Sequence, residues 1–214
     1  MQYIELKESL KEFTIFSLAD IERIDSNFYR RRLNEWQDKG YIKKIIKGYY
    51  IFSDLELSEN ILFEIANRIY SPSYISFEMA LSYYHLIPES VYGITSASTR
   101  RTYKFKTPIA EFSYRTIKHN LFFGYNLINY GHKCFKIASI EKAILDYFYI
   151  NPDIKEDSDF AGIRINKDIF LKQVNKKKLY KFLEKFAQKT LTKRIKCFLE
   201  YIKRPLKNTS ETSI

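Results

Sequence analysis

The chain is poor in the residues that many catalytic and cofactor sites require. Its 214 residues include 6 glycines and 2 cysteines. The glycine-rich patterns that cradle phosphate, G-x-x-x-x-G-K-[ST] and G-x-G-x-x-G, are both missing from the sequence. Cys134 and Cys197 stand apart, without a C-x-x-C pair or a histidine at metal-ligand spacing, so we expect two buried free thiols. These absences predict a protein without catalytic residues, metal or cofactor, and therefore not an enzyme.

Long apolar runs are missing as well. No stretch reaches about eighteen apolar residues, the length that a transmembrane helix needs. Residues 1–13, MQYIELKESLKEF, alternate acidic and basic side chains and lack the apolar core of a signal peptide. We therefore expect a cytoplasmic protein with no membrane partner. Aromatic residues, by contrast, are abundant, with 18 Tyr and 17 Phe, which is enough to build the core of one large or two small domains.

The net charge of +11 is unevenly distributed along the chain. Residues 151–214 carry 16 basic and 8 acidic side chains, whereas residues 1–52 carry 10 and 8. The positive field is therefore strongest in the C-terminal third. Such a field suits contact with phosphate, an RNA or an acidic protein.

Residues 16–52, FSLADIERIDSNFYRRRLNEWQDKGYIKKIIKGYYIF, contain the most informative pattern. A short apolar helix is expected over residues 18–24, a polar turn over 25–27 and a second helix over 28–39. Gly40 follows that helix, where a residue free to adopt positive φ is favoured. Two strands with β-branched residues and lysines then flank Lys47-Gly48, the expected tip of a hairpin. This order predicts a winged helix-turn-helix.

The second helix of this pattern has two faces. Tyr29, Leu33 and Trp36 recur at helical spacing and are expected to pack against the first helix. Because arginine recognises guanine and phosphate and asparagine recognises adenine, the other face suits DNA. The alternatives are a solvated face of a small helical domain and a protein-contact surface. The residues on this other face are Asn27, Arg30, Arg31 and Asn34.

The remaining chain predicts a mixed domain. Helices are expected over residues 2–13, 58–70, 77–86, 140–150, 167–174, 176–189 and 191–203, with an acidic loop over 153–162. Five candidate strands, at residues 91–97, 101–106, 111–117, 122–125 and 133–138, predict a small antiparallel sheet of four or five strands. The fold class is therefore α+β. The expected division is a winged-helix domain over residues 1–57, a second α+β domain over 58–206 and a disordered polar tail over 207–214.

One candidate strand carries both aromatic and basic residues. Arg101 alternates with Tyr103 and Phe105, while Lys104 and Lys106 share the opposite face. A basic surface beside aromatic rings suits stacking on RNA or single-stranded DNA. The alternative, which we favour from the sequence, places the aromatic face in the core and the lysine face in water.

Two patterns are compatible with enzyme sites. Ser139 and Lys142 match S-x-x-K, but the companion SDN and KTG triplets are missing, so we expect Ser139 to cap a helix. A metal-dependent nuclease would need clustered carboxylates, and the acids of the central block have no characteristic spacing, so we expect helix caps or surface residues. These acids are Glu64, Glu78, Glu111, Glu141 and Asp146.

Four segments between residues 16 and 150 carry a family resemblance. They are GYIKKIIKGYYIF, YISFEMALSYYHLIPE, GITSASTRRTYKF followed by FSYRTI, and KIASIEKAILDYFY. In this order they resemble the AbiEi-type antitoxins of bacterial abortive-infection, or type IV, toxin–antitoxin systems. None of the four is a catalytic signature, and the resemblance rests on their order.

The resemblance implies two roles. The winged helix would repress its own operon by binding inverted repeats in promoter DNA as a homodimer, and the region after Ser58 would neutralise a nucleotidyltransferase-like toxin in phage defence. A solitary winged-helix transcription factor and a nucleic-acid-processing enzyme remain the alternatives. Carried over by position, DNA contact falls on Ser26, Asn27, Arg30, Arg31, Asn34, Lys44, Lys47 and Gly48.

Overall fold

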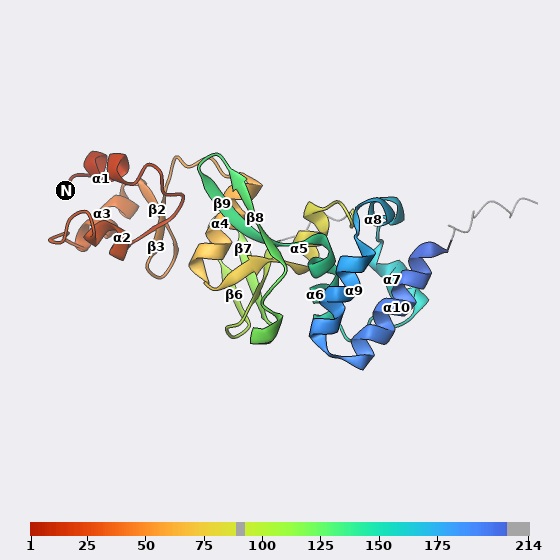
Figure 1. Cartoon of the computed structure of the whole chain (residues 1–214). Helices are drawn as coiled ribbons and strands as arrows, with labels where there is room; N and C mark the ends of the chain where they lie inside the picture. Colours follow the sequence, from red (N-terminus) through yellow and green to blue (C-terminus); the bar gives the residue numbers. More distant parts are fainter. Residues whose placement is uncertain (89–92, 205–214) are drawn as a thin grey trace, which may run out of the picture. The chain divides into compact units, whose positions relative to one another are not determined.

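The computed structural model describes residues 1–88 and 93–204, and these residues form an α+β protein (Figure 1). The chain divides into two compact units. The first comprises Met1–Ile75 with Val91–Ile137, and the second comprises Ser76–Ser90 with Ala138–Ile214. The predicted boundary after residue 57 stays a prediction, and the predicted tail lies outside the described residues.

The first unit contains the strands and the N-terminal helices. Its helices are α1 (Tyr3–Ser9), α2 (Leu18–Glu22), α3 (Arg31–Asp38), α4 (Glu59–Ile69) and the 3-10 helix η1 (His119–Leu121). Its strands are β1 (Phe16–Ser17), β2 (Ile42–Ile46), β3 (Tyr49–Phe52), β4 (Ser73–Ile75), β5 (Ile94–Ser98), β6 (Tyr103–Lys106), β7 (Glu111–Thr116), β8 (Tyr125–Tyr130) and β9 (Lys133–Ala138).

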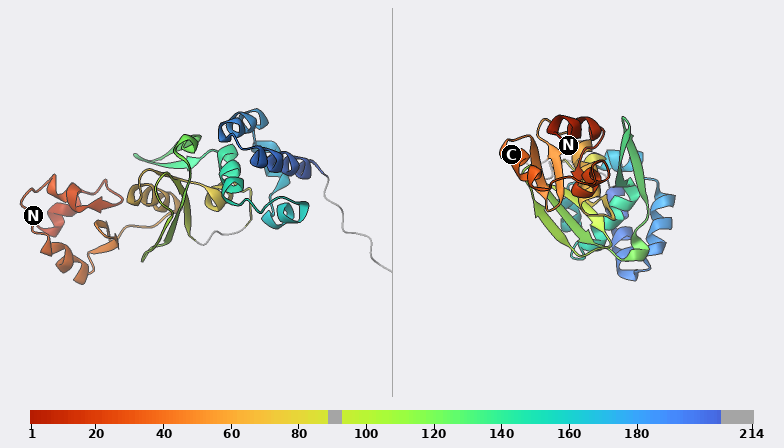
Figure 2. Two further views of the ribbon diagram at one scale, coloured as in Figure 1. Left: turned by 90° about the horizontal axis from the view of Figure 1, so that it is seen from below. Right: turned by 90° about the vertical axis from the view of Figure 1, so that its left-hand side faces the viewer.

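The second unit is helical, and Figure 2 shows its helices from two further directions. These helices are α5 (Phe77–Tyr83), α6 (Ile140–Ile150), α7 (Asp157–Ile163), α8 (Lys167–Gln173), α9 (Lys176–Phe186) and α10 (Lys189–Lys203). Phe198 of α10 lies at its centre, with ring centroids 4.8 Å from Phe148, 5.5 Å from Phe160 and 5.6 Å from Phe170. None of the described helices combines the length and the apolar character needed to cross a membrane.

The smaller sheet has the strand order β1-β3-β2, and both of its pairings are antiparallel. Phe16 lies opposite Tyr50, and Lys43 lies opposite Ile51. The register shifts between Lys44 and Ile46, so β2 carries an irregularity of the bulge type near its end.

The larger sheet corrects the expectation of a small antiparallel sheet. Six of the described strands form it, in the order β6-β7-β5-β4-β9-β8. The β5–β7 and β4–β9 pairs are parallel, whereas β4–β5 and β6–β7 are antiparallel. After β5 the chain forms the edge strand β6, and it then returns as β7, which lies between β5 and β6. Because β7 runs antiparallel to β6, it is parallel to β5. Alternation within each strand cannot reveal such neighbours, because it is a local signal.

Several expected elements were misplaced. The predicted strand over residues 122–125 is wrong, because η1 ends at Leu121, residues 122–124 are irregular with Gly124 at a φ of +74°, and β8 begins only at Tyr125. The predicted acidic loop contains α7, whose start is stabilised by a reciprocal capping box between Glu156 and Asp159. Residues 71–76, between two predicted helices, contain β4, which is too short for an alternating pattern.

Candidate nucleic-acid interface

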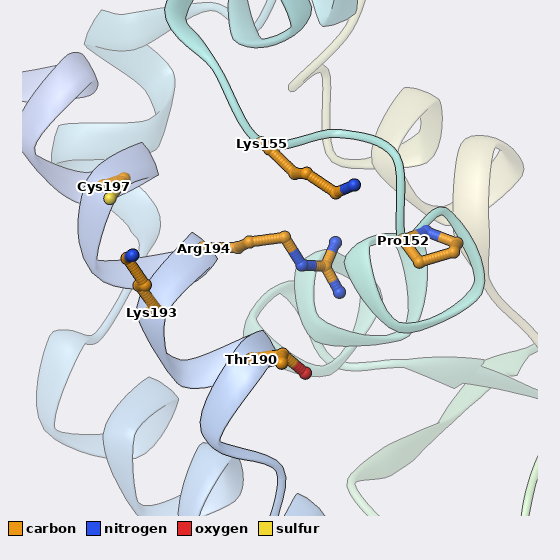
Figure 3. Close-up of a pocket in the computed structure, with 6 residues that line it drawn as sticks. All are labelled: Pro152, Lys155, Thr190, Lys193, Arg194 and Cys197. Carbon is orange, nitrogen blue, oxygen red and sulfur yellow. The ribbon is translucent and has the colours of Figure 1, made fainter.

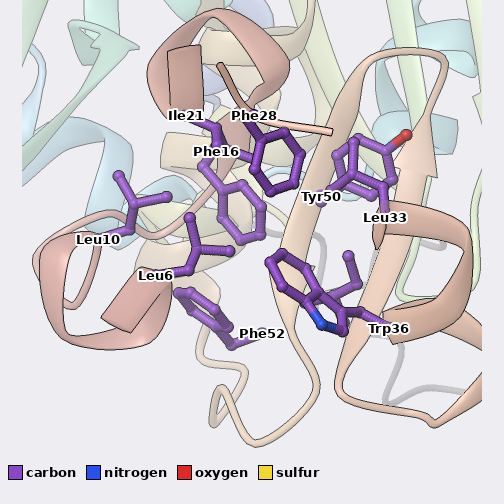
Figure 4. Packing of buried hydrophobic residues seen from close by; sticks show 10 residues of the cluster. Leu6, Leu10, Phe16, Ile21, Phe28, Leu33, Trp36, Tyr50 and Phe52 are labelled. Carbon is purple, nitrogen blue, oxygen red and sulfur yellow. The ribbon is translucent and has the colours of Figure 1, made fainter. Parts of the chain in front are cut away.

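The helices of the N-terminal module are packed on a common apolar core. Phe28, Leu33 and Trp36 are each at most 7% exposed. Figure 4 shows how these side chains contact residues of the small sheet, α1 and α2. The members of this core are Leu6, Leu10, Phe16, Ile21, Phe28, Leu33, Trp36, Ile42, Tyr50 and Phe52. All ten lie within residues 1–52, so the module has a core of its own.

The start of α2 is stabilised by a capping box. Asp20 N–H donates to Ser17 Oγ at 3.3 Å, and Ser17 N–H donates to the Asp20 carboxylate at 2.8 Å. The same buried carboxylate accepts from Arg68 of α4 at 3.0 Å. Burial would raise the pKa of Asp20, but the hydrogen bonds from Ser17 and the charge of Arg68 outweigh it and lower that pKa.

A short polar turn joins α2 to α3. Asn27 N–H donates to the Asp25 side chain at 3.1 Å, and Phe28 N–H donates to the Asp25 carbonyl at 3.1 Å. α2 itself ends at Glu22, two residues before the predicted end, and this Asx-type turn follows it. α3 begins at Arg31, three residues later than predicted. Both helices are therefore shorter than the sequence suggested, although their order is as predicted.

Gly40 ends α3 as predicted. Its φ is +71°. Gly40 N–H donates to the Gln37 carbonyl, and Tyr41 N–H donates to the Trp36 carbonyl, both at 2.9 Å. These two bonds form a Schellman motif, which satisfies carbonyls at the end of the helix and needs a residue that tolerates positive φ.

The five candidate residues between α2 and the middle of α3 are all exposed. They are Ser26, Asn27, Arg30, Arg31 and Asn34. Within α3, Arg31 and Asn34 are three residues apart and so lie on one face. Neither side chain has a hydrogen bond or an ion pair to another residue in the described part of the chain. Their donor groups are therefore free to contact a ligand.

The three consecutive arginines have different environments. Arg31 is unpaired and exposed, whereas Arg30 forms an ion pair with Glu22 at 2.9 Å. Arg32 is half-buried, and its guanidinium donates to the main-chain carbonyl of Met1. The sequence could not separate these roles, because the partners of Arg30 and Arg32 come from other elements.

Tyr29 corrects another expectation. Its side chain is 62% exposed, whereas we expected it to pack, together with Leu33 and Trp36, against the helix over residues 18–24. Tyr29 lies before the first residue of α3, so the helical spacing used to place it does not apply. Phe28, its neighbour, is 7% exposed and occupies the core position instead.

The β2–β3 hairpin presents the remaining candidate residues. Lys44 and Lys47 are exposed, and so is Lys43, which was not among the candidates. Gly48 lies at the tip with a φ of +85°, as the predicted hairpin turn requires. Three exposed ammonium groups thus occur within five residues of one hairpin, an arrangement that suits contact with phosphate.

Acidic residues lie on the same module. Glu35 and Asp38 are exposed on α3, toward its C-terminal end, and Glu22 pairs with Arg30. The N-terminal half of α3 is therefore its more basic half. In helix-turn-helix proteins the N-terminal residues of the recognition helix contact the bases.

The acids considered for metal catalysis form separate pairs. Glu111 pairs with Lys104 at 2.7 Å, and Glu141 pairs with Lys178 at 2.8 Å. The described residues contain no group of three or more His, Cys, Asp or Glu side chains that could hold a metal ion. The expectation of caps or surface positions is wrong for Glu141, which is 3% exposed and also accepts from Asn175 N–H at 3.1 Å. It is wrong for Asp146 as well, which is fully buried within α6.

The S-x-x-K residues lie in the interior of the second unit. Ser139 is the N-cap residue of α6 as predicted, but its hydroxyl makes no capping hydrogen bond. Lys142 pairs with Asp146 one turn later, and both side chains are fully buried. Ser76 Oγ donates to the same carboxylate at 2.8 Å. Burial outweighs the attraction of Asp146 and lowers the pKa of Lys142.

A cavity of about 440 Å³ in the second unit is lined by basic residues (Figure 3). The buried Arg194 donates to the carbonyls of Phe148 and Asn151, both at 2.9 Å, and so stabilises the end of α6. Cys197 beside it is half-buried and Cys134 is exposed, so the expectation of two buried thiols is wrong, although both are free. The lining residues are Pro152, Lys155, Thr190, Lys193, Arg194 and Cys197.

Comparison of the chain with models of known protein families gives no match, and comparison with curated proteins gives none either. The geometry of the N-terminal module and the order of its segments therefore carry the functional argument.

Proposed function

We propose that this protein is a winged-helix repressor that binds double-stranded DNA with α3 and the β2–β3 hairpin. The main supporting observation is that Arg31 and Asn34 are exposed, unpaired among the described residues and on one face of a helix with a packed core behind it. Arginine pairs with guanine and asparagine with adenine in the major groove. Lys44 and Lys47 neutralise the flanking phosphates.

The element order supports the same proposal. The chain runs α1-β1-α2-α3-β2-β3, and its small sheet has the order β1-β3-β2. A helix-turn-helix followed by a basic hairpin is the arrangement expected of a winged helix, in which the second helix enters the groove. Ser26 and Asn27 precede α3 and lie where they would approach the DNA backbone.

We further propose that the protein acts as the antitoxin of a type IV toxin–antitoxin pair and represses its own operon. The support is the resemblance to AbiEi-type antitoxins over four ordered segments. In this proposal the protein binds inverted repeats as a homodimer in the cytoplasm, and the residues after Ser58 neutralise a nucleotidyltransferase-like toxin. A solitary regulator would share the DNA-binding half, and the neighbouring reading frame distinguishes the two.

The first experiment is a titration of the purified protein against its own upstream DNA and a scrambled duplex of equal length, at two salt concentrations. A specific complex should be at least about 10³-fold tighter than the scrambled one, and both affinities should fall steeply with salt. Equal, weak binding to both duplexes would contradict the proposal and favour a protein-contact role for the winged helix.

Toxin neutralisation needs a separate test. The neighbouring gene is expressed alone and together with this protein, and growth is measured. Rescue by the full chain but not by residues 1–57 supports the proposed division of labour. Rescue by residues 1–57 alone would contradict it.

A further inference from the structure

A second basic and aromatic surface lies on the first unit, where the β5–β6 connection meets the end of α4. A cavity of about 590 Å³ occurs here. Its volume falls within the range of about 300–1,000 Å³ that is usual for small-ligand sites. It is lined by Tyr70, Thr99, Arg100, Arg101 and Tyr103, which we call the Tyr103 surface.

Tyr103 is exposed because α4 stops short of it. Tyr103 lies opposite Tyr114 in the β6–β7 pair, so the two rings share one face of the sheet. Tyr114 is fully buried, and its hydroxyl donates to the Ala66 carbonyl of α4 at 2.7 Å. Since α4 ends at Ile69 and β6 is an edge strand, Tyr103 remains 54% exposed.

This exposure corrects the interpretation that we favoured from the sequence. The aromatic face of β6 was expected to lie in the core, yet Tyr103 is exposed and Phe105 is half-buried. Lys104, on the opposite face, pairs with Glu111 at 2.7 Å. The charge of Lys104 is therefore already compensated, whereas the aromatic face carries an exposed ring that a ligand can contact.

The aromatic rings of this surface hold one another in place. The Tyr70 and Tyr103 rings stack with centroids 6.2 Å apart and an interplanar angle of 21°. Phe105 supports the Tyr103 ring at 4.6 Å. The Tyr70 hydroxyl donates to the Arg101 carbonyl at 2.8 Å and so ties the β5–β6 connection to α4. A ring fixed in this way loses little conformational entropy when it stacks on a ligand.

Two arginines place positive charge beside the exposed ring. The Arg100 guanidinium lies 4.2 Å above the Tyr70 ring and donates to the Ser71 carbonyl at 3.2 Å. Arg101 is exposed, and its guanidinium has no ion pair or hydrogen bond within residues 1–88 and 93–204. Neither arginine is neutralised by a described carboxylate, so the surface is complementary to an anion.

We propose that the Tyr103 surface binds an unpaired nucleotide segment, with one base stacked on Tyr103 and the adjacent phosphates on Arg100 and Arg101. Every nucleobase has a face that can stack on an aromatic ring, so this mode tolerates different sequences. Bases in a duplex are already stacked, so the surface selects single strands. An acidic protein would be attracted by the arginines but would not need the exposed ring.

The test is fluorescence anisotropy on the full chain with labelled oligomers of about twelve nucleotides. The oligomers are oligo(dT), oligo(U), an abasic strand of equal charge and a blunt duplex without operator sequence. The base-containing strands should bind at least about fivefold tighter than the abasic strand. Tighter binding of either oligo(dT) or oligo(U) than of the abasic strand supports the proposal, and comparison of the two shows which strand is preferred.

Substitutions at the exposed ring separate stacking from charge. Tyr103→Ser should weaken binding of oligo(dT) and oligo(U) by about 5- to 100-fold. Tyr103→Phe, which keeps the aromatic ring, should bind both strands as the wild type does. Arg101→Ala should weaken binding of the abasic strand as well, because the substitution removes a phosphate contact. Leu127→Ser is the matched control, since Leu127 is 60% exposed on the other edge strand, β8.

Three results would overturn the proposal. One is equal affinity for the abasic and base-containing strands. Another is unchanged binding by Tyr103→Ser, which would assign the affinity to the lysine-rich C-terminal helices. The third is displacement of the oligomer by polyglutamate as effectively as by unlabelled oligomer, which would identify a surface for acidic proteins.

Discussion

The three consecutive arginines should respond differently to replacement by alanine. Arg31 is exposed and unpaired in the described structure, so Arg31→Ala should leave the melting temperature unchanged. If Arg31 contacts a guanine, its loss costs about 1–3 kcal/mol for the specific duplex. This corresponds to operator binding weaker by about 5- to 150-fold, with little change for the scrambled duplex.

Arg32→Ala is the matched control. Arg32 is half-buried, and its guanidinium donates to the Met1 carbonyl. Loss of this partly exposed bond should cost about 1 kcal/mol of stability and lower the melting temperature by about 2–4 °C. The variant should keep most of its operator affinity, because Arg32 already has a partner within the protein.

Arg30 adds a third outcome, because in the proposed complex Glu22 would compete with DNA for the Arg30 guanidinium. The Arg30–Glu22 ion pair is 2.9 Å long, and the Arg30 side chain is 71% exposed. Exposed pairs of this kind are worth about 0.2–1 kcal/mol. Glu22→Gln should therefore tighten DNA binding by up to about fivefold, since it frees Arg30 and removes a negative charge.

The assay is a fluorescence-anisotropy titration of each variant against the operator and the scrambled duplex, together with a thermal melt. The reasoning about α3 fails if Arg31→Ala and Arg30→Ala both leave operator binding intact. It also fails if Arg32→Ala weakens operator binding more than Arg31→Ala while the melting temperature stays unchanged, because Arg32 would then be the contacting residue.

Three further predictions concern the β2–β3 hairpin, a buried carboxylate and a buried ion pair. Lys47→Ala should weaken binding to the operator and to the scrambled duplex equally. It should also reduce the slope of log affinity against log salt by about 0.9. Asp20→Asn should lower the urea midpoint at pH 7. Because the folded pKa of Asp20 lies below its ordinary value of 3.8, the ionised carboxylate stabilises the fold above pH 3.8, and this contribution is lost as pH falls through the folded pKa. The stabilities of variant and wild type should therefore converge once the pH is below the folded pKa. Asp146→Asn should cost about 3–5 kcal/mol in denaturant unfolding, because it leaves the Lys142 charge buried, and adding Lys142→Met should recover most of this loss.

Each of these three has an outcome that would contradict it. A sequence-dependent effect of Lys47→Ala would place that side chain against a base. A constant difference between Asp20→Asn and wild type across the pH range would mean that the charge of Asp20 does not stabilise the fold. A double variant as unstable as Asp146→Asn would show that the carboxylate acts through other contacts.

Local signals in the sequence were sufficient for several elements. The helix over residues 140–150 was predicted with the bounds that α6 has. Gly40 and Gly48 were assigned to turns, and both have positive φ. The buried positions of Leu33 and Trp36 followed from helical spacing. These features depend on a few neighbouring residues, so their physical causes are present in a short window of sequence.

The tertiary structure decided which strands are neighbours and which side chains remain exposed. Parallel pairing of β5 with β7 depends on the path of the chain through β6. The exposure of Tyr103 depends on where α4 ends, and the different roles of Arg30, Arg31 and Arg32 depend on partners from other elements. Sequence alone determined the types of residue on each candidate surface. Only long-range packing determined which of them are free to bind, because exposure and pairing are set by residues distant in the chain.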